Sequence, residues 1–222
     1  ILTCLLAVEN AKMDEMVEFS HDAVFGVPRD GSNMGIDVGE ILPMEDCLYG
    51  ILVGSANEVA AAVGEHVGGD TETFLQMMND RAKELGCKNT NFMNANGLHD
   101  DNHYTTAYDL ALIAREFYKN ETLQKISSTS FYTVYPTSTQ PDQWDMQNHH
   151  KLCKNLPYEY EGFIGGKTGY TNVARQTLVS GAQRNGMRLI CVVLKEESPY
   201  QFTDTISLFD FPSPHSIEDS DH

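Results

Sequence analysis

Hydrophobic residues recur at helical spacing through the first 130 residues of the chain. The apolar positions of residues 1–12 share one face and predict a helix that packs against a core. Asp70 is a typical N-cap and Gly86 a typical stop for a helix between them. Further helices are predicted over residues 43–54, 56–67, 107–118 and 123–126. With an extended segment at 14–20 and a Gly- and Asn-rich loop at 28–39, residues 14–130 are expected to form a mostly helical lobe.

Beyond Ser130 the period changes to the two-residue alternation of a β-strand. Phe131, Thr133 and Tyr135 alternate with polar positions and predict a strand. Residues 174–183 and 187–195 are two strand-like runs joined through Asn185-Gly186, which strongly indicates a tight antiparallel hairpin. A helix is predicted over residues 199–209 and a frayed tail over 212–222. Residues 131–211, together with the helix of 1–12, are therefore expected to form a sheet lobe.

Charge and length limit the classes of partner. The chain has 222 residues, with 32 acidic and 15 basic side chains, and its formal net charge is −17. Such a surface repels phosphate backbones, so nucleic acid is not an expected partner. The longest apolar stretches, such as residues 189–194, are far shorter than the roughly 20 residues of a membrane helix, and no membrane segment is expected in this chain.

Cysteine and histidine positions give no metal signature. The five cysteines are widely separated and lack the spacing of a zinc site, which favours free, buried thiols; a single disulfide remains an alternative if the protein is exported. His99 and His103 are four residues apart, but they follow a predicted turn and are expected to lie in a loop. His149-His150 is a weaker candidate, and neither a metal nor a cofactor is expected.

The segment Gly165-Gly166-Lys167-Thr168-Gly169 concentrates one cation, one hydroxyl and three glycines. A phosphate-binding P-loop would require glycine at position 161, where Glu161 stands, and a helix after Thr168, where the pattern is strand-like. The residues fit an exposed edge strand on which a peptide lies as an extra strand, with its carboxylate near Lys167 and Thr168. A glycine-rich turn with a solvated lysine remains an alternative for this segment alone.

Ser55-Ala56-Asn57 supplies a hydroxyl and a carboxamide at a junction between predicted helices. Taken alone, Ser55 is most simply interpreted as a helix N-cap. S-x-N followed about 110 residues later by K-T-G at an edge strand is, however, the arrangement of the serine penicillin-recognising enzymes. The two motifs are therefore expected to line one groove, with the Ser55 hydroxyl near the Lys167 ammonium.

Beyond these motifs, nearly the whole chain resembles the low-molecular-weight penicillin-binding proteins of the serine D-alanyl-D-alanine carboxypeptidase type. The resemblance is carried by ILTCLLAVEN at the start, LVGSANEVAAAV around Ser55, FMNANGLHDDNHYTTAYDLA from Phe92, GGKTGYT and MRLICVVL. It implies an α/β (α+β) fold of the β-lactamase/transpeptidase-like type, in which an antiparallel sheet flanked by helices meets a mostly helical lobe. Residues 1–211 would form that catalytic domain.

The resemblance also implies roles for individual residues. Ser55 would relay a proton toward the leaving amine, Asn57 would hold the substrate amide, and Lys167 would supply positive potential in the cleft. The remaining three positions would bind substrate: Thr168 through the terminal carboxylate, Gly169 by allowing close approach, and Tyr170 by providing one backbone N–H of an oxyanion hole.

One element of the family pattern is missing. Members place a nucleophilic Ser and its partner Lys in S-x-x-K directly before a segment like Ile1-Leu2-Thr3, whereas no lysine of this chain has serine three residues before it. The nucleophile is therefore expected upstream of Ile1, together with the first sheet strands, and the fragment alone is expected to be inactive. No E-x-x-L-N segment occurs, which favours a carboxypeptidase over a β-lactamase.

The expected activity is removal of the terminal D-Ala from peptidoglycan stem peptides through an acyl-enzyme. The implied partners are stem peptides that end in D-Ala-D-Ala, and β-lactams as covalent inhibitors of the intact enzyme. Such a hydrolase of cell wall biogenesis would be exported to the cell-wall face of the bacterial membrane. The alternative from another class is a non-catalytic peptidoglycan-binding or scaffolding protein on the same fold.

Overall fold

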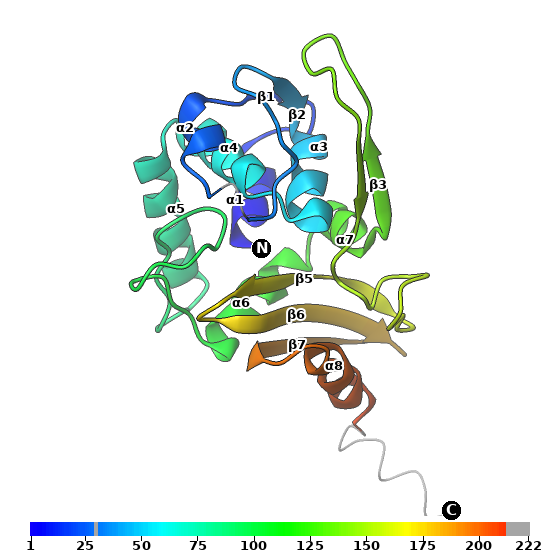
Figure 1. The fold of residues 1–222 in the computed structure, drawn as a ribbon. Helices are drawn as coiled ribbons and strands as arrows, with labels where there is room; N and C mark the ends of the chain where they lie inside the picture. Colours follow the sequence, from blue (N-terminus) through cyan, green and yellow to red (C-terminus); the bar gives the residue numbers. More distant parts are fainter. Residues whose placement is uncertain (29–30, 212–222) are drawn as a thin grey trace, which may run out of the picture.

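The computed structural model describes residues 1–28 and 31–211, in which helices cover both faces of a small antiparallel sheet (Figure 1). The α/β fold with an antiparallel sheet, which the sequence predicts, is therefore confirmed. The first part of the chain contains α1 (Leu2–Asn10), β1 (Met16–Glu18), α2 (His21–Phe25), β2 (Ile41–Pro43), α3 (Met44–Tyr49), η1 (Gly50–Gly54), α4 (Asn57–Gly68), α5 (Thr71–Glu84), α6 (Ala107–Phe117) and α7 (Glu121–Ser128). The second part contains β3 (Phe131–Val134), β4 (Trp144–Gln147), β5 (Phe163–Thr171), β6 (Arg175–Arg184), β7 (Met187–Glu196) and α8 (Tyr200–Asp210).

The largest sheet has the order β5-β6-β7, and both of its pairings are antiparallel. Asn185 and Gly186 have φ of 52° and 77°, the left-handed values that a tight two-residue turn requires, so the predicted hairpin is confirmed. In the three-stranded sheet β5 is an edge strand, and its residue Lys167 is paired with Val179 of β6. The sheet therefore presents the K-T-G segment at its rim.

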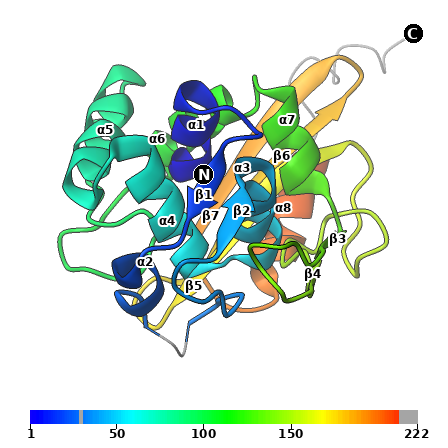
Figure 2. The same ribbon diagram turned by 90° about the horizontal axis from the view of Figure 1, so that it is seen from above.

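Helices occupy the two faces of this sheet. Figure 1 shows α8 on one side and the other helices on the opposite side. Seen from above in Figure 2, α1 lies between α4, α6 and α7. The N-cap predicted for α5 is present, because Asp70 Oδ1 accepts from the Thr73 N–H at 2.7 Å. Thr106 caps α6 in the same way, since its Oγ1 accepts from the Asp109 N–H at 3.1 Å.

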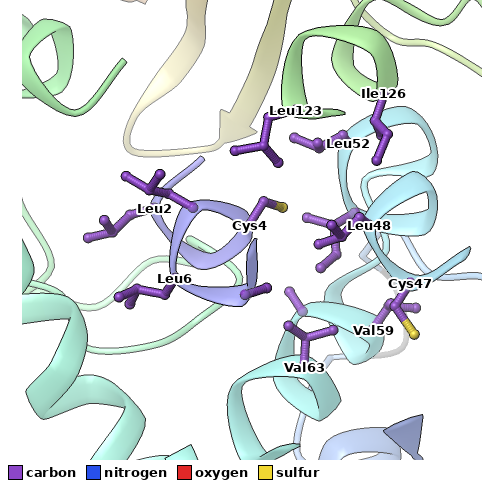
Figure 3. Close-up of a cluster of buried hydrophobic side chains, with 14 of the residues drawn as sticks. Leu2, Cys4, Leu6, Cys47, Leu48, Leu52, Val59, Val63, Leu123 and Ile126 are labelled. Carbon is purple, nitrogen blue, oxygen red and sulfur yellow. The ribbon is translucent and has the colours of Figure 1, made fainter. Parts of the chain in front are cut away.

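Two hydrophobic clusters hold the elements together. The larger one surrounds α1; in Figure 3 the Cys4 side chain points toward Leu48 and Leu52, whereas Leu2 and Leu6 lie on the other side of the helix. The smaller one lies between the sheet and α8 and contains Leu152, Tyr160, Leu178, Ala182, Cys191, Phe202 and Phe209. All five cysteines are buried and free, as the sequence predicts.

Some elements differ from the sequence-based expectation. The helix predicted over 43–54 is divided, because α3 ends at Tyr49 and a π-helical turn follows over Gly50–Gly54. Strands β2 and β4 and the short helix α2 were not predicted, since segments of three to five residues carry too little periodicity to be recognised. The predicted tail at 212–222 lies outside the described residues. Within the described ranges, no helix combines the length and apolarity needed to cross a membrane.

Candidate active site

Ser55 stands at an unusual backbone junction between two helices. The π-helical turn Gly50–Gly54 ends at Ser55, whose φ of 60° and ψ of 33° are left-handed. Ala56, not Ser55, is the N-cap of α4, so the N-cap interpretation of Ser55 is wrong. π-helical turns and left-handed non-glycine residues both cost free energy and are concentrated at functional sites. Here they leave the Ser55 hydroxyl available to the neighbouring strand instead of to its own helix.

The Ser55 hydroxyl meets Lys167 directly. Lys167 Nζ donates to Ser55 Oγ at 2.8 Å and to the Thr168 carbonyl at 2.8 Å. The two sequence motifs, 112 residues apart, therefore come together as the sequence predicts. In this contact an ammonium orients a serine hydroxyl oxygen, which is the geometry for passing a proton or for stabilising negative charge beside that hydroxyl.

The electrostatic environment of Lys167 favours an anionic ligand. Burial lowers the pKa of Lys167 to about 8, while the nearby Cys4 thiol acts in the opposite direction. In the described part of the chain, no carboxylate lies within ion-pair distance of Lys167. The net charge of −17 makes the surface as a whole repel anions. The Lys167 ammonium, which is hydrogen-bonded to neutral oxygens, attracts an anion locally.

Asn57 occupies the first turn of α4 and is fixed by a neighbouring loop. Its backbone N–H and its side-chain Nδ2 both donate to the Ser32 carbonyl, at 3.0 and 2.9 Å. The next residue, Glu58, is buried and accepts from the backbone N–H groups of Met34 and Gly35 at 2.5 and 3.1 Å. Asn57 and Glu58 thus hold residues 32–35 beside the Ser55 turn, and the orientation of the Asn57 amide is fixed.

The remaining predicted residues follow Lys167 on β5. Thr168 is paired with Leu178 and Gly169 with Thr177 of β6. A Cβ on Gly169 would lie 2.5 Å from Thr177 Oγ1, so a side chain at this position would require the Thr177 side chain to move. Tyr170 is 57% exposed at the rim. These three residues offer a backbone edge, a hydroxyl and space for a peptide beside the Lys167 ammonium.

The first turn of α1 lies against the same site. Cys4 is fully buried, and burial raises the pKa of its thiol to about 11, so the thiol is neutral at ordinary pH. The charge of Lys167 lowers the pKa of the Cys4 thiol, against the larger effect of burial. Thr3 Oγ1 donates to the Ala95 carbonyl at 2.5 Å and ties this turn to the 94–98 loop. The first turn of α1 is therefore near enough to Lys167 for their charges to interact.

Histidine positions outside these motifs show no metal site. His99 lies in a loop beside Asp101 at 3.3 Å, and no group of three or more His, Cys, Asp or Glu within residues 1–28 and 31–211 could hold a metal ion. Sequence reasoning missed two features that border the site. The Ser32 carbonyl and the buried ring of His150 have no local sequence signal, because both act through contacts with distant segments.

Comparisons with known proteins agree with these observations. A protein-family model described as D-alanyl-D-alanine carboxypeptidase matches residues 1–198. The chain is 36% identical over 205 residues to the D-alanyl-D-alanine carboxypeptidase DacF of Bacillus subtilis, covering 90% of this chain and 50% of DacF. It is 32% identical over 187 residues to DacB2 of Mycobacterium tuberculosis, covering 80% of this chain and 60% of DacB2.

Solved structures show the same fold. The Streptomyces K15 DD-transpeptidase superposes with a TM-score of 0.85 at 26% identity, covering 94% of this chain and 83% of that chain. A D-alanyl-D-alanine carboxypeptidase of Mycobacterium tuberculosis superposes with a TM-score of 0.81 at 26% identity, covering 94% of this chain and 77% of that chain. The chain spans about half of the length of the curated relatives that it matches, for example 50% of DacF.

Proposed function

Because this chain belongs to the D-alanyl-D-alanine carboxypeptidase family, we propose that it is part of a serine hydrolase that removes the terminal D-alanine from peptidoglycan stem peptides. The observation that carries this proposal is the 2.8 Å contact between Ser55 and Lys167, which unites two distant motifs at an edge strand. Residues 1–211 would form the catalytic domain, and the nucleophilic serine and its lysine would precede Ile1.

The reaction would be acyl transfer in two steps. The serine hydroxyl of the upstream S-x-x-K segment attacks the carbonyl between the two D-alanines, and the terminal D-alanine leaves with a proton on its amine. Water then attacks the acyl-enzyme ester and releases the shortened peptide. The upstream lysine would take the serine proton, which requires a site that keeps it unprotonated. The neighbouring Lys167 ammonium would favour that state.

Three residues of this chain would act at the reacting groups. Ser55 would pass a proton toward the leaving amine, with its hydroxyl oxygen held by the Lys167 ammonium. Asn57 would position the substrate amide with the side-chain N–H that is not bound to Ser32. Lys167 would stabilise negative charge near the reacting carbonyl and attract the substrate carboxylate.

The edge strand would bind the peptide. Thr168 would donate its hydroxyl to the terminal carboxylate, Gly169 would let the peptide backbone approach, and the Tyr170 N–H would form half of an oxyanion hole. One such donor contributes about 2.7–4 kcal/mol to transition-state stabilisation. A substrate of this kind places the enzyme outside the cytoplasmic membrane, on its cell-wall face, and makes β-lactams covalent inhibitors because they mimic the acylating peptide.

Fluorescent penicillin tests the proposal in the longer protein that includes the segment before Ile1. The protein should be labelled covalently and should release D-alanine from a D-Ala-D-Ala peptide. Replacement of the upstream serine should abolish both. Lys167→Ala should slow labelling by orders of magnitude, and Lys83→Ala, on the exposed face of α5, should not change it. Saturable peptide binding without D-alanine release would instead identify a non-catalytic peptidoglycan-binding protein.

A further inference from the structure

A buried polar pair lies behind the K-T-G segment, on the face of the sheet opposite Ser55. His150 Nε2 is 2.8 Å from Ser180 Oγ, and both residues are 0% exposed. The surroundings are apolar, since the His150 ring lies 4.5 Å from the Phe163 ring and 6.2 Å from the Phe202 ring. A polar pair in such surroundings has no water to replace a lost partner, so it strongly favours one arrangement.

The pair contacts β5 at the residue immediately before Lys167. Gly166 is paired with Ser180 across β5 and β6, and a Cβ on Gly166 would lie 2.6 Å from His150 Nε2. The ring therefore occupies the space where any other residue would carry a side chain. Since successive residues of a strand face opposite sides, contact of Gly166 with His150 directs Lys167 to the other face, toward Ser55.

Further hydrogen bonds fix His150 itself. Its backbone N–H donates to Asn148 Oδ1 at 2.8 Å, and Asn148 Nδ2 donates to the carbonyls of Ser127 and Thr129 at 3.1 and 2.8 Å. The Leu152 N–H donates to Nδ1 at 3.4 Å, which leaves Nε2 to carry the proton. The ring hydrogen-bonds the Val179 backbone, and its Nε2 lies 2.8 Å from Ser180 Oγ. The ring is thus held by α7 on one side and by β6 on the other.

We propose that His150 and Ser180 are positioning residues that set the register of β5 on β6 and thereby hold Lys167 against Ser55. A shift of β5 by one residue would place the Lys167 side chain against the His150 ring and away from Ser55. A purely hydrophobic contact in the same space would tolerate such sliding, because hydrophobic attraction has no direction. The inference concerns how the proposed active site is held, and it rests on the proposed function only for its kinetic measurement.

Four variants of the longer protein separate positioning from general stability. Ser180→Ala and His150→Leu should each slow acylation by fluorescent penicillin by about 10- to 100-fold, the range for a displacement of up to 1 Å at a reacting group. His150→Gln, which can still donate to Ser180, should stay within about threefold of wild type. The double variant His150→Leu/Ser180→Ala removes both polar partners, so its Tm should recover while its acylation remains slow.

Thr205→Val provides the matched control behind the same sheet. Thr205 is also 0% exposed, and its Oγ1 lies 3.8 Å from Cys191 Sγ of β7, two strands away from Lys167. This variant should lower Tm without slowing acylation. Acylation rates that follow Tm through the whole series would overturn the positioning role.

Hydrogen exchange gives a measurement that does not depend on activity. Backbone amides of β5 should exchange faster in Ser180→Ala, His150→Leu and the double variant, but not in His150→Gln or Thr205→Val. Unchanged exchange in β5 would refute the inference even if acylation changed. A wild-type protein that never acylates would contradict the proposed function, and the exchange measurement would still decide the role of His150 and Ser180.

Discussion

Raising the pH from 7 to 10 should weaken substrate capture by the longer enzyme, because the Lys167 ammonium is lost. Burial lowers the pKa of Lys167 to about 8. At pH 9 about one tenth of the molecules keep the charge, so kcat/KM for a peptide with a free terminal carboxylate should fall about tenfold between pH 7 and pH 9. The contact with Ser55 then joins two neutral groups and contributes less than a charged one.

The same ionisation should stabilise the fold over this pH range. Lys167 loses its proton near pH 8 when folded, whereas an unfolded chain keeps it to the ordinary value of 10.5. The unfolded state therefore binds more protons in this window, and the free energy of unfolding rises with pH. The difference between the folded and unfolded pKa values of Lys167 corresponds to about 3 kcal/mol of unfolding free energy. Because the Lys167 side chain retains some solvent contact, we expect about 1–2 kcal/mol to be measured.

The assay compares wild type with Lys167→Met at each pH. D-alanine release gives kcat/KM, and urea unfolding gives the stability. Other titrating groups contribute equally to both proteins, so the difference between them isolates Lys167. Lys167→Met should have low kcat/KM throughout and should lack the extra gain of stability above pH 8. A wild-type kcat/KM that stays constant to pH 10, or identical stability profiles, would refute the reasoning.

Three further predictions concern stability. Asp109 is 2% exposed and its Oδ2 accepts from the N–H groups of Lys88 and Asn89 and from Thr90 Oγ1, so Asp109→Ala should cost about 2–4 kcal/mol in urea unfolding; an unchanged midpoint would contradict this. Tyr118→Phe removes the O–H that donates to the Gly165 carbonyl at 2.8 Å and should cost about 1–2 kcal/mol; a stability equal to wild type would show that this bond contributes nothing. Burial lowers the pKa of His150 to about 3. The contribution of neutral, buried His150 to the free energy of unfolding is therefore fully present above about pH 6.5 and is lost as the pH falls toward 3. Wild type should lose about 2 kcal/mol between pH 8 and pH 5, and His150→Leu should lose measurably less over that range.

Local sequence patterns were sufficient to predict most of the secondary structure and the residue types of the candidate active site. Helices α1, α4, α5 and α6 repeat apolar residues over nine or more positions, and α5 also carries the N-cap Asp70; these signals act within one or two turns. The Asn185-Gly186 hairpin is equally local, since its left-handed backbone depends on the two residues themselves. The S-x-N and K-T-G motifs are recognisable because their residue types occur at fixed short spacing.

The geometry of the site depends on contacts between segments that are distant in the chain. In the π-helical turn before Ser55, Gly50 lies against Met34 and Gly54 lies against Met146. Both methionines are distant in the sequence, so the local pattern of residues does not predict these contacts. Ser55 interacts with Lys167 instead of capping α4, and Asn57 is fixed by Ser32. The amino-acid order therefore specifies which groups can react. Their distances and pKa values arise only when packing removes water and brings distant backbones together, because burial and hydrogen-bond geometry are properties of the folded chain.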